Sequence, residues 1–353
     1  MQVFSRPLRL LNFAQLFRQC TLDSQWQLRA FAAASSQMEA IKSLRESTSA
    51  PILDVKKALV EASWNVEEAY KALRKKGIAA ASKKASRHAA EGLIGIAASD
   101  NAAAIVEVNS ETDFATKTEQ FRSMVQAVAS AALALEATGS ARIDSGTLAS
   151  SSTAQGSELA DVIADCAGSV RENIQLRRAH RLVCPSGIIA SYLHASSSPG
   201  LGKMGALVAI TDSKGALEKE KAAKAKELAA SIAMHIVATR PLCLDRKTIP
   251  TEALEAEKRV LTEQAERSGK PANIIERMVA GRLHKFYEES CLLDQRYVKD
   301  DVKKIHEVLK EASKEMGADL HIQDFVRFQC GEGLEKEQKS FADDVAQALQ
   351  QTG

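Results

Sequence analysis

The stretch AIVEVNSETDFA, residues 104–115, decides the fold. Its first five residues, Ala104–Val108, are apolar and rich in β-branched side chains, which favours a strand. Thr112 or Asp113 can then cap a helix, because short polar side chains accept hydrogen bonds from the first helical amides. The sequence therefore predicts a strand followed by a helix from Phe114 to Glu136, with a polar turn between them.

A second stretch further along the chain repeats this pattern. Gly92–Ile94 precedes the first strand, and Gly187–Ile189 precedes Ala206–Ile210 in the same way. Each β-rich pair is followed by a helical segment, the second from Leu217 to Val237. The fold class is therefore predicted to be α+β, and the middle of the chain is predicted to hold two related α+β subdomains. Their predicted bounds are residues 78–185 and 186–335.

Residues 38–77 indicate a compact module of three helices that looks like a ubiquitin-associated domain. Asn65 can begin the third helix, with Glu68 at the capping-box spacing, and Gly77 is predicted to end it. Apolar residues recur at helical spacing and predict a small shared core. These residues are Ile41, Leu44, Leu59, Val66, Ala69, Tyr70 and Leu73.

Two further helical parts are predicted in the C-terminal half. Thr251–Arg267 and Ala272–Cys291 are joined by a short Gly- and Pro-containing connection, which predicts an antiparallel helical hairpin, or coiled coil, over residues 251–291. Residues 336–353 are predicted to form a C-terminal helical module. The Ser-rich segment 139–157 has few large apolar residues and is interpreted as a linker or loop.

Residues 1–34 have the composition of a transit peptide. The N-terminal segment carries four arginines against one acid, Asp23, and ends in Arg29–Ala32, which resembles a mitochondrial processing site. We therefore expect the protein in the mitochondrial matrix; a plastid address or an ordinary disordered N-terminus are the alternatives. Removing four basic residues and one acidic residue leaves 43 basic and 44 acidic residues. A mature chain with this balance of basic and acidic residues lacks the excess of positive charge that nucleic-acid binding requires.

Motifs of other functional classes are absent or misplaced. Gly200–Gly205 fits the dinucleotide pattern G-x-G-x-x-G, but a strand rather than a helix follows, so we interpret it as a hairpin loop. His235 has apolar neighbours and is interpreted as structural. No nucleophile, base and orienting group come together in the sequence, so we expect no enzyme activity, no catalytic residue and no cofactor. No apolar run is long enough to span a bilayer.

The six cysteines are scattered along the chain, and none lies at metal or redox spacing from another. Cys20 lies within the predicted transit peptide. We expect the other five to be free thiols, several of them in the core, and we expect no metal site.

The pattern Glu-Val-Asn-x-x-Thr-Asp-Phe at Glu107–Phe114 is one of several landmarks that occur in order along the chain. The others are Arg45-Glu46-x-Thr48, Asp54-x-Lys56-Lys57-Ala58-Leu59, Ile232-Ala233-Met234-His235, Ser268-Gly269-Lys270-Pro271, Arg327-Phe328 and Gly331-Glu332-Gly333. With these landmarks the chain resembles the elongation factor Ts family, in an organellar form, from about residue 38 to residue 350.

This resemblance implies a guanine-nucleotide exchange factor that binds elongation factor Tu, both GDP-bound and nucleotide-free, and promotes GDP release. It implies that Thr112, Asp113 and Phe114 form a wedge beside the magnesium site of the partner. It also implies that His194 touches the partner's nucleotide domain. Ala115 stands where a valine is common in the family.

The N-terminal module is implied to contact the same nucleotide domain through Arg45, Ile52 and Leu53. The chain departs from the family here, because Pro51 replaces a usual glycine and Ile52–Leu53 replaces a methionine pair. The apolar character is kept, so we expect the contact to be kept. The alternative function is that of an adaptor that binds ubiquitin through residues 38–77 and has no exchange activity.

Overall fold

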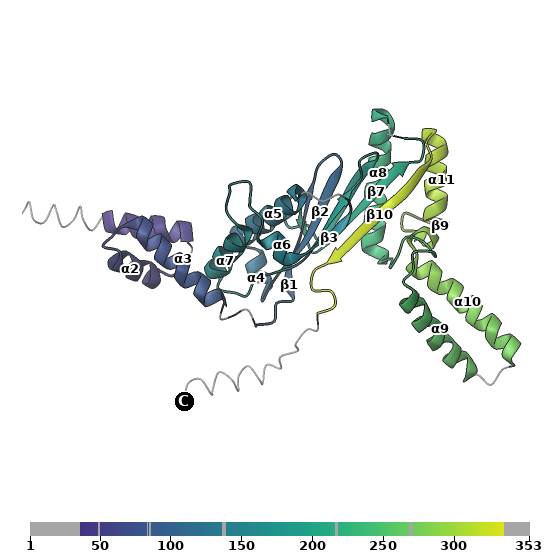
Figure 1. Ribbon diagram of the computed structural model, residues 1–353, viewed down its shortest axis with the longest axis horizontal. Coiled ribbons are helices and arrows are strands. Elements are labelled where there is room, and N and C mark those ends of the chain that lie inside the picture. The colour runs from purple at the N-terminus through teal and green to yellow at the C-terminus, as the bar shows by residue number, and fades with distance from the viewer. Residues whose placement is uncertain are drawn as a thin grey trace, which may run out of the picture. The chain divides into compact units, whose positions relative to one another are not determined.

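The computed structural model describes residues 36–334, apart from 49, 83, 85, 136–138, 216–217 and 268–270. It shows a mixed α+β fold with antiparallel sheets (Figure 1). The chain divides into two compact units, Met1–Ala80 and Ala81–Gly353. The predicted transit peptide and the predicted C-terminal helical module lie outside the described residues.

The described part of the first unit contains three helices: residues 36–48, α2 (Ile52–Glu61) and α3 (Val66–Ser82). The predicted cap of the third helix is confirmed, because the Asn65 side-chain oxygen accepts hydrogen bonds from the amides of Glu67 and Glu68 at 3.0 and 3.3 Å. The predicted stop at Gly77 is wrong, since α3 continues to Ser82. A glycine inside a helix costs only about 1 kcal/mol, which the rest of a long helix can offset.

The core of the first unit contains Leu44, Leu59, Ala69 and Leu73, as predicted. Val55 and Ala58 of α2 complete it, whereas two of the predicted members, Val66 and Tyr70, are exposed. The error has a geometric reason. Ala69 and Leu73 already occupy the buried stripe of α3, and Val66 and Tyr70 lie on the solvent side of that narrow stripe.

Two antiparallel sheets form the framework of the second unit. The five-stranded sheet has the order β3-β4-β2-β1-β6, and the three-stranded sheet has the order β10-β7-β5. The strands of the first sheet are β1 (Glu91–Ala98), β2 (Ala102–Ser110), β3 (Ala141–Ile143), β4 (Gln175–Val183) and β6 (Leu201–Gly202). Those of the second sheet are β5 (Ile188–His194), β7 (Met204–Asp212) and β10 (Leu320–Gln329). A separate short pair is formed by β8 (Arg296–Tyr297) and β9 (Asp300–Lys304).

Both predicted strand pairs are confirmed, as β1–β2 and β5–β7. The G-x-G-x-x-G motif lies in the β5–β7 hairpin, as expected, and its Leu201–Gly202 segment forms β6 on the edge of the other sheet. Adding a Cβ at Gly205 would place it 3.2 Å from the Ile94 and Ile96 side chains. The small residue therefore allows the two sheets to approach closely.

Helices cover the outer faces of both sheets. The helices of the second unit are α4 (Asp113–Thr116), α5 (Glu119–Ala134), α6 (Ser145–Ala149), α7 (Leu159–Val170), α8 (Lys219–Thr239), α9 (Thr251–Glu266), α10 (Ala272–Ser290), η1 (Leu292–Asp294) and α11 (Ile305–Met316). One core lies between α5, α7 and the five-stranded sheet, and another between α8, α11 and the three-stranded sheet. A third core lies between the sheets, which gives four layers.

Strand β2 shows how the sequence produces these layers. It is buried along its whole length, and successive side chains point to opposite faces. Ala104, Val106 and Val108 pack under α5, whereas Ile105 packs between the sheets. Glu107 lies on the same face as Ile105 and is also buried.

Two predictions for the segments after β2 are corrected. The single helix expected from Phe114 to Glu136 is two helices, α4 and α5, because the Thr118 side chain accepts from the Phe121 amide at 3.3 Å and starts a new helix. The linker expected at residues 139–157 contains β3 and α6. Leu148 of α6 is fully buried, which anchors this segment to the core.

The predicted helical pair is confirmed as α9 and α10, which project from the rest of the second unit (Figure 1). Arg282 of α10 donates to the Gln264 side chain of α9 at 2.8 Å. The predicted apolar seam of α10 is half-buried along its length. Its members are Ile275, Val279, Leu283 and Phe286.

His235 is buried in α8 and has hydrogen-bond partners on both ring nitrogens. Nε2 lies 3.0 Å from the Gln295 side-chain oxygen, and the Val298 amide donates to Nδ1 at 3.2 Å. This arrangement needs a neutral ring protonated at Nε2. Burial lowers the pKa of His235, against a smaller opposing effect of Gln295.

The buried histidine should make folding stability depend on pH. Its pKa is lower in the folded chain than in the unfolded chain, so the unfolded chain binds more protons just below the ordinary value of about 6.5. The free energy of unfolding should therefore fall as the pH drops from 7.5 to 5.5. His235→Gln should reduce this slope by up to about 1.4 kcal/mol per pH unit in urea titrations; an unchanged slope would show that the ring takes up protons equally in the folded and unfolded chain.

Candidate functional site

The Thr-Asp-Phe turn (residues 112–114) joins β2 to α4 and is fixed by a glutamate from a distant loop. The Glu172 carboxylate accepts from the Thr112 amide at 2.9 Å and from the Thr112 hydroxyl at 2.5 Å. The Thr112 hydroxyl oxygen also accepts from the Ala115 amide at 3.5 Å and so caps α4, as predicted. Thr112 therefore acts as the anchor of the turn.

A second set of contacts fixes the residue before the turn. The Asn173 amide donates to the Glu111 carboxylate at 2.6 Å, and Arg87 pairs with the same carboxylate at 3.4 Å. The Asn173 side chain donates to the Arg87 main-chain oxygen at 2.6 Å. Glu172 and Asn173 therefore hold the turn where it leaves β2, just after Arg171, whose left-handed conformation ends α7.

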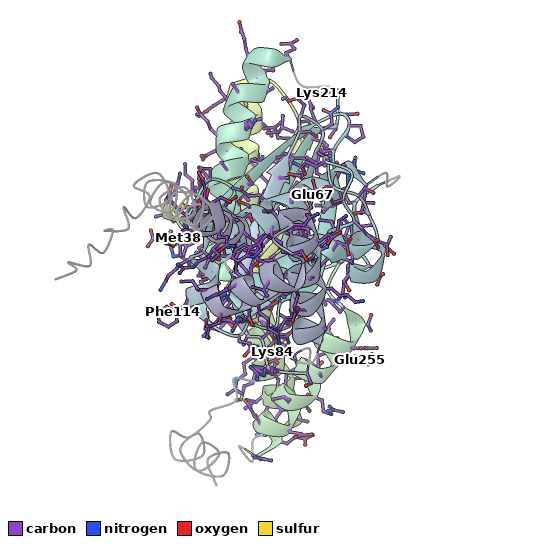
Figure 2. All side chains as sticks on the ribbon, turned by 90° about the vertical axis from the view of Figure 1, so that its left-hand side faces the viewer. Met38, Glu67, Lys84, Phe114, Lys214 and Glu255 are labelled. Atoms are coloured by element: carbon purple, nitrogen blue, oxygen red, sulfur yellow. The ribbon has the colours of Figure 1, made fainter. Side chains whose placement is uncertain are left out.

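Phe114 projects into solvent from this fixed turn. Its side chain is 73% exposed, whereas the neighbouring Ala115 and Thr116 are buried. Figure 2 shows the Phe114 ring pointing outward from the ribbon. This exposure excludes a position of Phe114 in the core beneath the helix. The small Ala115 is buried under the turn.

Asp113 carries a stable negative charge beside this ring. Its carboxylate lies 2.7 Å from the Lys117 ammonium, which holds the pKa of Asp113 below its usual range, with a smaller contribution from Lys203. The same ammonium lies 5.0 Å from the centroid of the Phe114 ring. A partner that uses the Asp113 carboxylate must therefore displace Lys117.

Lys203 lies beside the second predicted contact, His194. The Lys203 amide donates to the His194 main-chain oxygen at 3.1 Å, and His194 pairs with Met204 at the loop end of the β5–β7 hairpin. The Lys203 ammonium lies 3.2 Å from the Glu91 carboxylate, at the start of β1. His194 is exposed there, with the Tyr192 hydroxyl 3.5 Å from Nδ1.

The other predicted contacts lie in the first unit and form an exposed apolar start to α2. Leu53 is 81% exposed and Ile52 is 51% exposed. Arg45 is also exposed, on the preceding helix. Pro51 occupies the position before the helix and adopts an extended conformation, which suits a proline at a helix start. The departure from the family glycine therefore leaves a regular helix.

The sequence did not indicate the buried ionic cluster behind the turn. Glu107 of β2 is fully buried and accepts from Arg177 at 2.9 Å and from Arg178 at 2.5 Å, both on β4. It also accepts from the Gly331 amide at 2.8 Å. Glu332 binds Arg327 at 2.7 Å, so the Gly331–Gly333 landmark serves as a cap on this cluster.

Glu172 offers a direct test of how the turn is held. Glu172→Ala removes both acceptors of Thr112, so we expect Phe114 to lose its fixed direction while the core stays intact. Amide hydrogen exchange at residues 112–116 should rise about tenfold or more, which equals about 1.4 kcal/mol of lost local stability.

Glu158→Ala is the matched control, because Glu158 makes no side-chain cap bond at the start of α7. Unchanged exchange in the Glu172 variant would mean that other contacts fix the turn.

The described residues contain no cluster of three or more histidine, cysteine or acidic side chains that could hold a metal ion. The site combines an exposed aromatic ring, a charged neighbour and a rigid support.

Comparison with known proteins identifies relatives over most of the chain. A family model described as "Elongation factor TS" matches residues 111–332. A protein named "Elongation factor Ts" from Paramagnetospirillum magneticum is 46% identical over 306 residues, covering 87% of this chain and 95% of the relative. The protein of the same name from Rhodospirillum rubrum is 46% identical over 313 residues, covering 88% of this chain and 97% of the relative. The protein of the same name from Parvibaculum lavamentivorans is 44% identical over 308 residues, covering 87% of this chain and 96% of the relative.

Proposed function

Because this chain belongs to the elongation factor Ts family, we propose that it is a guanine-nucleotide exchange factor that releases GDP from elongation factor Tu. The observation that carries the proposal is the exposed Phe114 ring on a rigid turn. Aromatic side chains are enriched in protein interfaces, and the contacts of Thr112 with Glu172 present this ring in a fixed direction, as binding to a partner pocket requires.

Exchange requires that the protein binds nucleotide-free elongation factor Tu more tightly than GDP-bound elongation factor Tu. GDP is held on a GTPase by phosphate-binding amides, a lysine and a magnesium ion. Phe114 inserted between elements of the partner would shift the loops that order the magnesium ion, and the charged Asp113 would compete for the same groups. No bond is made or broken in this mechanism, so the protein needs no catalytic residue and no cofactor.

The Phe114 side chain alone cannot weaken GDP binding enough for exchange. A ten-thousandfold shift of the equilibrium from GDP-bound to nucleotide-free partner requires about 5.5 kcal/mol of differential binding. We therefore propose that His194 and the N-terminal contacts Arg45, Ile52 and Leu53 extend the surface. In this reading the first unit is a ubiquitin-associated-like module used for partner binding, and the two strand–helix repeats are related subdomains that present the Thr-Asp-Phe turn and His194.

The proposed function predicts a reciprocal effect that calorimetry can measure. If the protein weakens GDP binding, GDP must weaken the binding of the protein to elongation factor Tu by the same factor. Titration into nucleotide-free and GDP-loaded elongation factor Tu should therefore give different affinities, and titration into ubiquitin should give no binding. Equal affinity for the two forms would contradict exchange activity, and ubiquitin binding alone would support the adaptor function.

We also propose that the protein works in the mitochondrial matrix, on the basis of the arginine-rich N-terminal segment. None of the helices within the described residues could cross a bilayer. The precursor should be imported and cut near Ala32. N-terminal sequencing of the protein from isolated mitochondria tests this; an intact Met1 or a cytosolic protein would contradict it.

A further inference from the structure

Cys243 and Cys291 lie far apart in the sequence but are in contact in the second unit. Their sulfur atoms are 3.6 Å apart. Main-chain hydrogen bonds fix the pair, because Leu292 donates to the Cys243 oxygen at 2.9 Å and Leu242 donates to the Ser290 oxygen at 2.8 Å. The two cysteines thereby form a parallel β-bridge. Neighbouring strands lie about 4.8 Å apart, which is within the range of Cα separations of disulfides.

The pair lies at the base of the helical hairpin. Cys291 directly follows α10, and Cys243 lies between α8 and α9. Arg246 and Asp294 join the same two segments through hydrogen bonds of 2.7 and 3.1 Å. A covalent bond between the two sulfurs would therefore close the loop that contains the whole hairpin.

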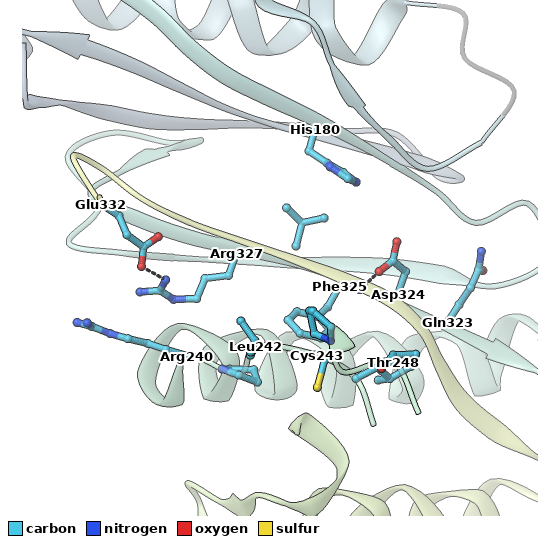
Figure 3. A pocket seen from close by; sticks show the side chains of 14 residues that line it. His180, Arg240, Leu242, Cys243, Thr248, Gln323, Asp324, Phe325, Arg327 and Glu332 are labelled. Carbon is cyan, nitrogen blue, oxygen red and sulfur yellow. Dashed lines mark hydrogen bonds and ion pairs between the residues drawn. The ribbon is translucent and has the colours of Figure 1, made fainter. Parts of the chain in front are cut away.

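The two cysteines differ in how accessible they are to a small molecule. Cys243 lines a cavity of about 610 Å³ beside β10, together with His180 and Arg240 (Figure 3). Cys243 is 6% exposed, whereas Cys291 is fully buried. A small oxidant can thus reach Cys243 first, and Cys291 is the thiol placed to react next. Among the described residues, no other two cysteine sulfurs are in hydrogen-bond contact.

We propose that Cys243 and Cys291 are a reversible oxidation site, at which a peroxide converts the thiol pair into a disulfide that locks the base of the α9–α10 hairpin. In the first step, the Cys243 sulfur attacks hydrogen peroxide, the O–O bond breaks, and one water leaves as the sulfenic acid forms. In the second step, the Cys291 sulfur attacks that sulfenic sulfur, and the S–O bond breaks as the S–S bond forms. The hydroxyl group leaves with the Cys291 proton as a second water.

The environment keeps the pair reduced under ordinary conditions. Burial raises the pKa of Cys243, and burial together with Cys243 raises the pKa of Cys291 to about 12. Thiolate is the reactive form, so oxidation is slow and requires sustained peroxide. The sulfurs must also approach by about 1.6 Å to reach the roughly 2.05 Å of a disulfide. A thiol reductant reverses the reaction by attack on one of the two sulfurs.

The test uses the full chain treated with hydrogen peroxide, alkylated and digested without reductant. We expect mass spectrometry to find a linked peptide pair containing Cys243 and Cys291, which a thiol reductant separates. The melting temperature should rise by about 5 °C on oxidation, because closing the long loop restricts the unfolded chain. Cys291→Ser should abolish the link and leave a sulfenic acid on Cys243 that dimedone traps.

The triple variant Cys166→Ser, Cys184→Ser and Cys330→Ser is the matched control and should still form the link. The proposal would be overturned if peroxide consumed thiols of the wild-type chain without forming this linked pair. It would also be overturned if dimedone labelled other cysteines but not Cys243 in the Cys291→Ser variant. These measurements need no elongation factor Tu, so their outcome is independent of the proposed exchange function.

Discussion

Phe114→Ala should slow factor-stimulated GDP release from elongation factor Tu by tenfold or more, about 1.4 kcal/mol of lost differential binding. The ring is 73% exposed, so its removal should leave the protein folded, with a melting temperature within about 2 °C of the wild type. The measurement is the GDP off-rate at saturating factor, together with thermal unfolding of the same variant.

Phe121→Ala is the matched control from the next helix. Phe121 is fully buried, and truncating a buried phenylalanine costs about 3 to 5 kcal/mol of stability. This variant should lose stability and keep normal release in its folded fraction. Asp113→Ala should give a smaller loss of release than Phe114→Ala. If Phe114→Ala instead melted early and released GDP normally, the wedge assignment would be wrong.

Glu107→Ala should destabilise the second unit by about 3 to 5 kcal/mol, because it leaves Arg177 and Arg178 in a largely buried place without their shared carboxylate. The Gly331 amide loses its acceptor at the same time. In a domain of this size the melting temperature should fall by roughly 10 °C.

Glu91→Ala removes a carboxylate from a partly exposed pair with Lys203 and is the matched control. It should cost less than about 1 kcal/mol, because solvent screens such pairs. Equal small effects of the two substitutions would mean that the buried cluster contributes nothing to the joining of the two sheets.

The sequence predicted those elements whose signals are local. The strands around Leu93, Ile105, Ile189 and Val208 combine β-branched residues with turns, and the α9–α10 pair has an apolar seam and a Gly-Pro connection. Strand β4 was missed because its arginines make it look like a surface segment. The partner of these arginines, Glu107, is about 70 residues away in the sequence. Only the folded chain therefore explains why β4 can lie inside the five-stranded sheet. Helix α11 was also missed, although the helical spacing of its apolar residues Ile305 and Leu309 could have indicated it.

For the site, sequence resemblance named candidate contact residues, and the structure shows how some of them are held. A capped helix start is compatible with a buried or an exposed Phe114. The structure shows an exposed Phe114, and the Glu172 contact with Thr112 explains why the turn is rigid. Neither Glu172 nor the Cys243–Cys291 pair has a local signal, since each depends on segments that meet only in the folded protein.

Nucleotide exchange is tested by the rate of GDP release from elongation factor Tu loaded with a fluorescent GDP analogue. The rate is measured by chasing with excess unlabelled GDP, without and with increasing amounts of the full protein. We expect a release rate that rises with the concentration of the protein to a plateau, and a much lower plateau for Phe114→Ala. A release rate that stays at its intrinsic value at every concentration of folded wild-type protein would contradict it.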